Sequence, residues 1–262
     1  MVAMYSKRKH FGQHMLVDEK TLDYEKEMLQ PDGKIVLEIG GGTGNLSKRI
    51  LNGAKHLIVV EKDWGMVESL DALIGNEKNV TVLEEDFLNL EEKDILSSSK
   101  QKKIDLIVSN VPYSISSPLL FKLNSFKFEK ALLCLQKEFV DRMVSEPGTK
   151  DWSRLSVMTH IYFKPIYLKK VGRGSFSPAP EVDSAIVMLY KKNEKVDERR
   201  DKFIEHLFSH KKNTLHAASK AREMKELYPD FENAIAQLKI EKRRVFTLTV
   251  DEIKELYSKI KE

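Results

Sequence analysis

Cysteine is scarce in this sequence and long apolar stretches are absent, and we expect no secretory leader. Its 262 residues include one cysteine, Cys134, so no intramolecular disulfide framework is possible, and its apolar neighbours at 131–135 predict an inert, buried thiol. No segment approaches the roughly 20 apolar residues that cross a bilayer. Residues 1–11 carry three basic side chains without the apolar stretch of a secretory signal. We therefore expect a cytoplasmic protein that is not embedded in a membrane.

The composition is that of a globular protein with a weak excess of positive charge. Hydrophobic residues make up 41% and charged residues 32% of the chain, which is long enough for one full α/β domain and a smaller attached domain. The net charge of +4 permits a nucleic acid as partner without requiring one. Positive charges gather in three islands, each of which alone is equally typical of a solvated surface: Lys7–His10; Lys211–Lys212 with Lys220 and Arg222; and Lys242–Arg244.

From Lys34 to about Tyr190, short β-branched runs alternate with helical patterns. This alternation predicts a mostly parallel sheet covered by helices, an α/β fold of the Rossmann-like kind. The expected strands are Ile35–Ile39, Leu57–Val60, Val80–Leu83, Asp105–Val108, Ala131–Leu135 and Ala185–Leu189. Asp18 is expected to cap the first helix, Gly53 to end the helix after a glycine cluster, and Ser116 to begin another.

A change of composition marks a second region. Around Lys191–Asp201 the sequence becomes almost purely charged, which is typical of a linker. After it, apolar residues recur only at helical spacing, as in Phe203–Phe208. We therefore predict two domains, residues 1–192 and a small helical domain of residues 193–262.

A glycine-rich segment, Glu38 to Asn45, lies where a strand is expected to pass into a helix. Its glycines allow a sharp turn and a close approach to a ligand. A dinucleotide fingerprint needs glycine at the position of Asn45, and a P-loop needs lysine directly after Gly44, so both are disfavoured. What remains, Glu-x-Gly-x-Gly-x-Gly, resembles the first motif of S-adenosylmethionine methyltransferases; the alternative is a flexible structural turn. The resemblance implies that Glu38, Gly40, Gly42 and Gly44 bind the cofactor.

Acidic residues follow the next two expected strands. Glu61 comes twenty-one residues after Gly40, about where a carboxylate reaches the two ribose hydroxyls of an adenosine cofactor. An exposed glutamate at a helix start is the alternative. Asp86 and Phe87 follow the third strand, where the carboxylate can accept a hydrogen bond from an adenine amine and the ring can pack on the base. We expect these residues to bind the cofactor, with a plain turn aspartate as the alternative for Asp86.

The tetrapeptide Asn110-Val111-Pro112-Tyr113 ends the fourth strand, at the edge of an α/β sheet where ligands bind. An aromatic amine is a poor nucleophile because its lone pair is conjugated into the ring, so an enzyme must hold it in line with the methyl group. The Asn110 side-chain oxygen and the Val111 carbonyl can accept its two N–H bonds, while Pro112 fixes the turn and Tyr113 stacks on the base. The tetrapeptide follows the glycine segment in the order and at the distance that favour these catalytic roles over a strand-ending turn. Asn110 is also expected to touch the cofactor.

The whole pattern resembles the ribosomal RNA adenine dimethyltransferase family, whose members place two methyl groups on adjacent adenosines near the 3′ end of small-subunit RNA. Phe11–Asp18 is similar to the N-terminal motif of this family, with Met15 in place of the usual phenylalanine. The resemblance implies that Gln13, His14 and Leu16 bind the cofactor.

Later segments carry the same resemblance. Phe176–Ser184 is similar to the family's Phe-x-Pro-x-Pro-x-Val-x-Ser loop, in which Phe176 holds the target base opposite the tyrosine, and two prolines stiffen the loop. Phe208–Asn213 resembles the basic start of the family's helical domain, and residues 138–157 look most like the archaeal and eukaryotic branch. The match runs from about residue 7 to 215 in the expected order.

The resemblance implies an S-adenosyl-L-methionine-dependent rRNA (adenine-N6,N6-)-dimethyltransferase that acts in ribosome biogenesis. Its expected partner is small-subunit ribosomal RNA in a particle of the pre-30S type, and we expect a monomer. Two alternatives stay open: a non-catalytic ribosome-assembly or nucleic-acid-binding factor on the same scaffold, and a large-subunit rRNA adenine methyltransferase. His206 and His210 have helical spacing, but they lack an adjacent glutamate in the zincin arrangement and a nearby Cys or Asp cluster, so no metal site is expected.

Overall fold

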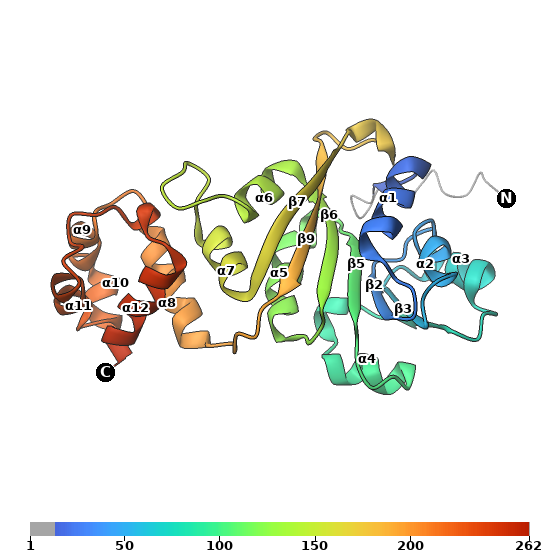
Figure 1. The fold of residues 1–262 in the computed structure, drawn as a ribbon, viewed down its shortest axis with the longest axis horizontal. Helices are drawn as coiled ribbons and strands as arrows, with labels where there is room; N and C mark the ends of the chain where they lie inside the picture. Colours follow the sequence, from blue (N-terminus) through green and yellow to red (C-terminus); the bar gives the residue numbers. More distant parts are fainter. Residues whose placement is uncertain (1–13, 262) are drawn as a thin grey trace. The chain divides into compact units, whose positions relative to one another are not determined.

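The computed structural model describes residues 14–261 and confirms an α/β, Rossmann-like fold around a mainly parallel sheet (Figure 1). The strands are β1 (Met15–Leu16), β2 (Ile35–Ile39), β3 (His56–Glu61), β4 (Val80–Glu84), β5 (Leu106–Asn110), β6 (Lys130–Gln136), β7 (Phe163–Val171), β8 (Phe176–Ser177) and β9 (Ser184–Lys191). Seven of them form one sheet in the order β4-β3-β2-β5-β6-β9-β7. The first five of this order run parallel, and β9 pairs antiparallel with β6. All expected strands are present, with ends that differ by at most two residues.

The helices begin and end largely where local signals predict. They are α1 (Glu19–Leu29), α2 (Ser47–Leu51), α3 (Trp64–Ile74), α4 (Glu92–Ser99), α5 (Ser116–Lys122), α6 (Lys137–Met143), α7 (Arg154–Tyr162), α8 (Glu198–Ser209), α9 (Leu215–Ser219), α10 (Arg222–Leu227), α11 (Phe231–Gln237) and α12 (Val250–Lys261). Asp18 caps α1 by accepting a hydrogen bond from the Thr21 N–H at 3.0 Å, and Ser116 begins α5, as expected. Gly53 lies in the turn that follows α2. Within residues 14–261, no helix combines the length and apolar character that a membrane crossing requires.

The centre of the sheet explains why its strands read as continuous apolar runs. All five residues of β2 are buried, because a central parallel strand is covered on both faces. The strand next to it, β3, is exposed only partly at His56. Glu38 stands in β2 and is therefore a carboxyl group in the middle of the core.

Two pairings were not predicted. The strand β7 contains Pro165 and several lysines, a composition that disguises a strand, and it lies at the edge of the sheet where proline and charge are tolerated. A separate ladder pairs β1 with β8, matching Met15 to Ser177 and Leu16 to Phe176. Two residues on each side are too few to give a period in the sequence.

The chain divides into two compact units. The sheet unit runs to Val140 and includes Ile166–Lys191; the helical unit contains Asp141–Pro165 and the chain from Lys192 onward. The division between Lys191 and Lys192 lies one residue from the predicted boundary. The segment Asp141–Pro165 was predicted in the first domain, but it groups with the C-terminal helices. Trp152 gives the physical reason, since its ring is 1% exposed and its Nε1 donates to the Leu248 carbonyl at 3.1 Å.

Candidate active site

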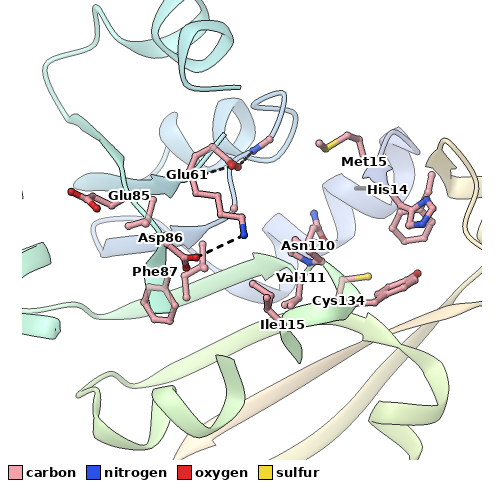
Figure 2. Close-up of a pocket in the computed structure, with 18 residues that line it drawn as sticks. His14, Met15, Glu61, Glu85, Asp86, Phe87, Asn110, Val111, Ile115 and Cys134 are labelled. Atoms are coloured by element: carbon pink, nitrogen blue, oxygen red, sulfur yellow. Dashed lines mark hydrogen bonds and ion pairs between the residues drawn. The ribbon is translucent and has the colours of Figure 1, made fainter. Parts of the chain in front are cut away.

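A cavity opens at the carboxyl ends of the central strands, within the sheet unit (Figure 2). The open space between its lining residues, including solvent at its mouth, is about 790 Å³. The predicted residues that line it are His14, Gly40, Gly42, Glu61, Asp86, Phe87, Asn110, Val111, Pro112, Tyr113 and Phe176. Motifs that are far apart in the sequence thus converge on one cavity.

The glycine segment forms a tight turn between β2 and α2. Gly40, Gly42 and Gly44 have φ angles of 77°, 53° and 78°, in the left-handed region that favours glycine. At Gly42 a Cβ atom would lie 2.8 Å from the Met15 sulfur, so a side chain there would press on the cavity wall. The turn therefore places the backbone of Gly42 at the cavity wall, where a larger side chain would contact Met15. A loop that binds a cofactor through its backbone requires such a close approach.

Glu61 fastens the glycine turn to the start of α3. Its Oε2 accepts the Gly42 N–H at 3.0 Å, and its Oε1 accepts the N–H groups of Lys62 and Asp63, both at 2.9 Å. The residue is 6% exposed, which excludes the alternative of an exposed helix-start glutamate. A carboxylate has about four acceptor positions, so Oε2 keeps capacity for a further donor.

Asp86 and Phe87 form one end of the cavity, as Figure 2 shows. The Asp86 Oδ1 accepts the Leu88 N–H at 2.9 Å, and its Oδ2 lies 3.8 Å from the Lys62 Nζ. The ring of Phe87 is 4% exposed and packs against Phe126, with 5.3 Å between ring centroids. The carboxylate is therefore held at a fixed angle beside a rigid aromatic surface.

Asn110 ends β5 and carries an unused acceptor. Its Nδ2 donates to the Glu25 Oε2 at 3.2 Å, while its buried Oδ1 has no hydrogen-bond partner among residues 14–261. Leaving a buried acceptor unsatisfied costs about 1–3 kcal/mol, and such groups gather at functional sites. The side chain can therefore accept one N–H bond from a ligand.

Aromatic side chains face one another near Asn110. The Tyr113 hydroxyl is hydrogen-bonded to the Ser184 Oγ at 2.7 Å, and burial raises the pKa of this hydroxyl, so it stays neutral. The His14 ring lies 5.8 Å from the Tyr113 ring, and its Nδ1 is 2.8 Å from the Pro178 carbonyl oxygen. Phe176, 7% exposed, completes this side through the β1–β8 ladder. A flat base can enter between such surfaces.

Comparison with known proteins agrees with this geometry. The family model described as ribosomal RNA adenine dimethylase matches residues 4–257 of the chain. The chain belongs to the ribosomal RNA adenine dimethylase family. It is 37% identical over 219 residues to the probable ribosomal RNA small subunit methyltransferase A of Methanopyrus kandleri, covering 80% of this chain and 75% of that protein. The protein of the same name from Methanosarcina acetivorans is 36% identical over 251 residues, covering 93% of this chain and 90% of the relative.

Solved structures give the same result for this dimethylase. A dimethyladenosine transferase from Plasmodium falciparum superposes with a TM-score of 0.82 at 30% identity, covering 93% of this chain and 96% of that one. The 23S rRNA methyltransferase ErmE superposes with a TM-score of 0.69 at 26% identity, covering 95% and 100%. The prediction of an S-adenosylmethionine-dependent rRNA methyltransferase is confirmed.

The residues in the cavity of the dimethylase fit S-adenosylmethionine. The Glu61 Oε2 has capacity for a ribose hydroxyl, and Asp86 with Phe87 can receive an adenine ring. Glu85 also lines the cavity, so three carboxyl groups suit the positive charge of the ligand. Within residues 14–261, no group of three or more potential ligating side chains is placed to hold a metal ion.

Three predicted cofactor residues, Leu16, Glu38 and Gly44, do not line the cavity, and a fourth, Gln13, lies outside the described residues. Leu16 is buried and turned away, because neighbouring residues of a strand face opposite sides; Met15 lines the cavity instead. Glu38 lies within β2, and Gly44 closes the turn by donating its N–H to the Gly41 carbonyl at 2.9 Å.

Sequence reasoning missed several residues of this site. Lys62 and Ile115 line the cavity. In the sequence, only their closeness to the predicted residues Glu61 and Tyr113 could have indicated this. Cys134 is free and buried, as predicted, but it also reaches the cavity wall. Glu25 gave a signal that was overlooked, since it occupies a core position of α1 between Leu22 and Leu29.

Two fully buried carboxyl groups lie behind the cavity wall. Burial raises the pKa of Glu25 to about 8, against the hydrogen bond from Asn110, and the neighbouring Glu38 raises it further. Burial likewise raises the pKa of Glu38 to about 8, with Glu61 as the nearby charge. Both groups are therefore mostly protonated at neutral pH.

Proposed function

We propose that this enzyme transfers two methyl groups to N6 of each of two adjacent adenosines near the 3′ end of small-subunit ribosomal RNA. The observation that carries the proposal is the unpaired Asn110 Oδ1 at the wall of a cavity bounded by Tyr113 and Phe176. That acceptor suits an amine with N–H bonds, and the rings suit a base. The names of the relatives supply the small-subunit target.

The side chains would act mainly by positioning the amine. S-adenosylmethionine, when bound, supplies an electrophilic methyl group. Asn110 Oδ1 and the Val111 carbonyl would each accept an N–H bond of the adenine amine, which holds its nitrogen in line with that methyl group. Formation of the N–C bond would break the bond between the methyl group and sulfur, and the sulfur would keep that electron pair; the alkylated nitrogen would then be acidic and lose its proton to solvent, so no strong base is needed.

The target base must reach the cavity as an unstacked nucleotide. Turning a base out of a helix costs a few kcal/mol unless it is already unpaired. A stacking surface can offset part of this cost, since stacking is worth about 1–3 kcal/mol per base. The proposal includes a pre-30S-type particle as substrate, because an assembling particle presents unpaired RNA ends. It also includes action as a monomer and a cytoplasmic location.

A large-subunit target is the second candidate, favoured by the superposition on ErmE. The dimethyladenosine transferase is the better match in both TM-score and identity, 0.82 and 30% against 0.69 and 26%. This difference supports dimethylation of adenosine, and the names of the curated relatives favour small-subunit RNA over the alternative.

The proposal is tested by offering tritiated S-adenosylmethionine with unmodified small-subunit particles, large-subunit particles and naked small-subunit RNA. We expect label only with small-subunit material, and mapping should place two dimethyladenosines side by side near the 3′ end. Label on the large-subunit particle would support the alternative. Cofactor binding without transfer to any of the three would favour a non-catalytic assembly factor.

A further inference from the structure

Glu25 is a carboxyl group placed where a helix normally has an apolar residue. The buried face of α1 consists of Thr21, Leu22, Glu25 and Leu29, and the Glu25 residue is 0% exposed. No lysine or arginine of the described chain forms an ion pair with Glu25. Lys169 attracts its charge, but this attraction is smaller than the effects of burial, the Asn110 hydrogen bond and Glu38. Burying an acidic group without a cation is unfavourable, so a structural role alone gives no reason for it.

Within the part of the chain that the structure describes, Asn110, which lines the cavity, is the one side chain to which Glu25 is hydrogen-bonded. The Asn110 Nδ2 donates to the Glu25 Oε2 at 3.2 Å, across 85 residues of sequence. The other carboxyl oxygen, Oε1, has no partner among the described residues. Glu25 therefore has a single polar partner, and that partner belongs to the catalytic tetrapeptide.

The direction of the Asn110 carboxamide decides whether the site can work. A carboxamide has nearly the same shape when its oxygen and nitrogen are exchanged, so only its hydrogen-bond partner selects one orientation. A protonated Glu25 still accepts through the carbonyl oxygen of its carboxyl group, so Oε2 can hold Nδ2 in either protonation state, and the unpaired Oδ1 is then the atom left to receive the N–H bond of an amine. In the exchanged orientation an NH2 group would meet the NH2 group of the substrate, and no hydrogen bond would form.

We propose that Glu25 is a positioning residue that orients the Asn110 carboxamide so that Oδ1 accepts the N–H bond of the target amine. The inference rests on the adenine-methylating function proposed above, and it adds a residue from α1 to the site. Glu25 acts only through Asn110 and touches neither cofactor nor RNA.

The test replaces Glu25 by leucine, which suits the apolar stripe of α1. For Glu25→Leu we expect turnover to fall about tenfold or more, because a hydrogen bond that selects the orientation is lost. The KM for S-adenosylmethionine should stay within twofold of wild type, and the thermal midpoint should be unchanged or higher. Leu29→Met, on the same face one turn further along, is the control for repacking and should keep wild-type turnover.

Two further variants separate orientation from stability. Glu25→Gln keeps an oxygen acceptor and should recover part of the turnover, whereas Glu25→Met should behave as Glu25→Leu and serves if the leucine variant does not fold. A structural role predicts the opposite pattern, in which stability and turnover fall together and the glutamine variant gives no recovery. Turnover of Glu25→Leu within twofold of wild type would overturn the inference.

A readout without catalysis distinguishes this inference from the proposed function. The side-chain amide signals of Asn110 in a ¹⁵N–¹H spectrum, assigned by their loss in Asn110→Ala, should shift in Glu25→Leu and stay put in Leu29→Met. Unchanged signals in Glu25→Leu would overturn the inference even in an active enzyme. Absent transfer by wild type, with shifted signals in the variant, would overturn only the proposed function.

Discussion

The two units of the molecule pair their carboxyl groups differently: Glu194 in the helical unit is partly buried and bound to cations, whereas Glu25 and Glu38 in the sheet unit are fully buried. In the helical unit, Glu194 accepts from the Arg200 Nη1 at 2.5 Å and from the Lys254 Nζ at 2.6 Å. These cations lower its pKa despite the opposing effect of burial, so it stays charged. In the sheet unit, Glu25 and Glu38 are fully buried without an ion pair, and burial raises the pKa of each to about 8.

The difference separates stability from function. Arg200 supplies the balancing charge in the helical unit: Asp201, whose pKa burial raises, receives the Tyr162 hydroxyl at 2.7 Å and lies 3.6 Å from the Arg200 Nε, although its Oδ1 has no hydrogen bond among the described residues. Around the cavity, one polar atom each of Glu25, Glu38 and Asn110 also has no hydrogen-bond partner among the described residues, and no cation is paired with either carboxyl group there. Unpaired buried groups are unfavourable to folding, and they persist where a ligand completes them or where they set a geometry.

The largest expected effect tests whether the unpaired Asn110 acceptor is functional. Asn110→Ala should lower turnover about a thousandfold, equivalent to about 4 kcal/mol of transition-state stabilisation, because the amine loses its fixed acceptor. Cofactor affinity, measured by calorimetry, should change little, and the free energy of unfolding should move by less than about 1 kcal/mol. Asn124→Ala removes a buried asparagine that does not line the cavity, and it should leave turnover unchanged.

A second prediction concerns the paired group in the helical unit. Arg200→Met should lower the free energy of unfolding by about 3 kcal/mol, because Glu194 and Asp201 lose a buried cation. Cofactor affinity of the folded fraction should stay at the wild-type value. Denaturant unfolding and calorimetry measure the two quantities, and Arg199→Met, at an exposed neighbour, should change neither. A large loss of affinity in Arg200→Met would break the contrast between the units.

A third prediction uses pH to expose the protonated state of Glu38. Its pKa is near 4.5 in an unfolded chain and about 8 in the folded one, so folding takes up a proton between these values. The stability from this group is complete below pH 4.5 and is lost as pH rises through 8. Glu38→Gln, which has the shape of the neutral acid, lacks this loss. The unfolding free energy of Glu38→Gln minus that of wild type should therefore rise by about 2–3 kcal/mol between pH 5.5 and 8. If this difference does not change with pH, Glu38 is already charged in the folded protein.

The smallest effect is expected from an exposed carboxylate of the sheet unit. Both Glu129 oxygens accept from the Lys34 Nζ at 2.8 Å, but the two side chains are 55% and 37% exposed. Glu129→Gln should lower the free energy of unfolding by less than about 1 kcal/mol, since water screens such pairs. Denaturant unfolding at low and high salt should show the difference shrinking with salt. An effect as large as that of Arg200→Met would mean that burial is not what separates the two classes.

Much of the fold was predictable, because its central strands carry a local signal. Ile35–Ile39 was placed without error, since a buried parallel strand is a continuous apolar run bounded by turn residues. The strand β7 was missed because an edge position tolerates Pro165 and lysine, residues that argue against a strand elsewhere. Residues 141–165 were placed in the wrong compact unit because the Trp152 to Leu248 hydrogen bond links distant segments.

The site was predictable where a motif holds its own geometry. The glycine turn and the tetrapeptide at Asn110 each shape a few consecutive residues, so sequence alone located them. Met15 was passed over in favour of Leu16 because only the register of the β1–β8 ladder shows which one faces the cavity. Glu25 was missed because its partner lies 85 residues away, a relation that no local pattern reports.

The β1–β8 ladder determines the stage of translation at which the cavity can be completed. It joins Met15 and Leu16, near the start of the chain, to Phe176 and Ser177. A chain growing on the ribosome exposes the first half of this pair long before the second, and domains tend to fold as units when their sequence has emerged. A nascent chain that has emerged as far as Lys122 thus possesses the glycine turn and the asparagine but not the opposite wall. Competence to hold an adenosine therefore arises late in translation, after Phe176 and Ser177 have emerged.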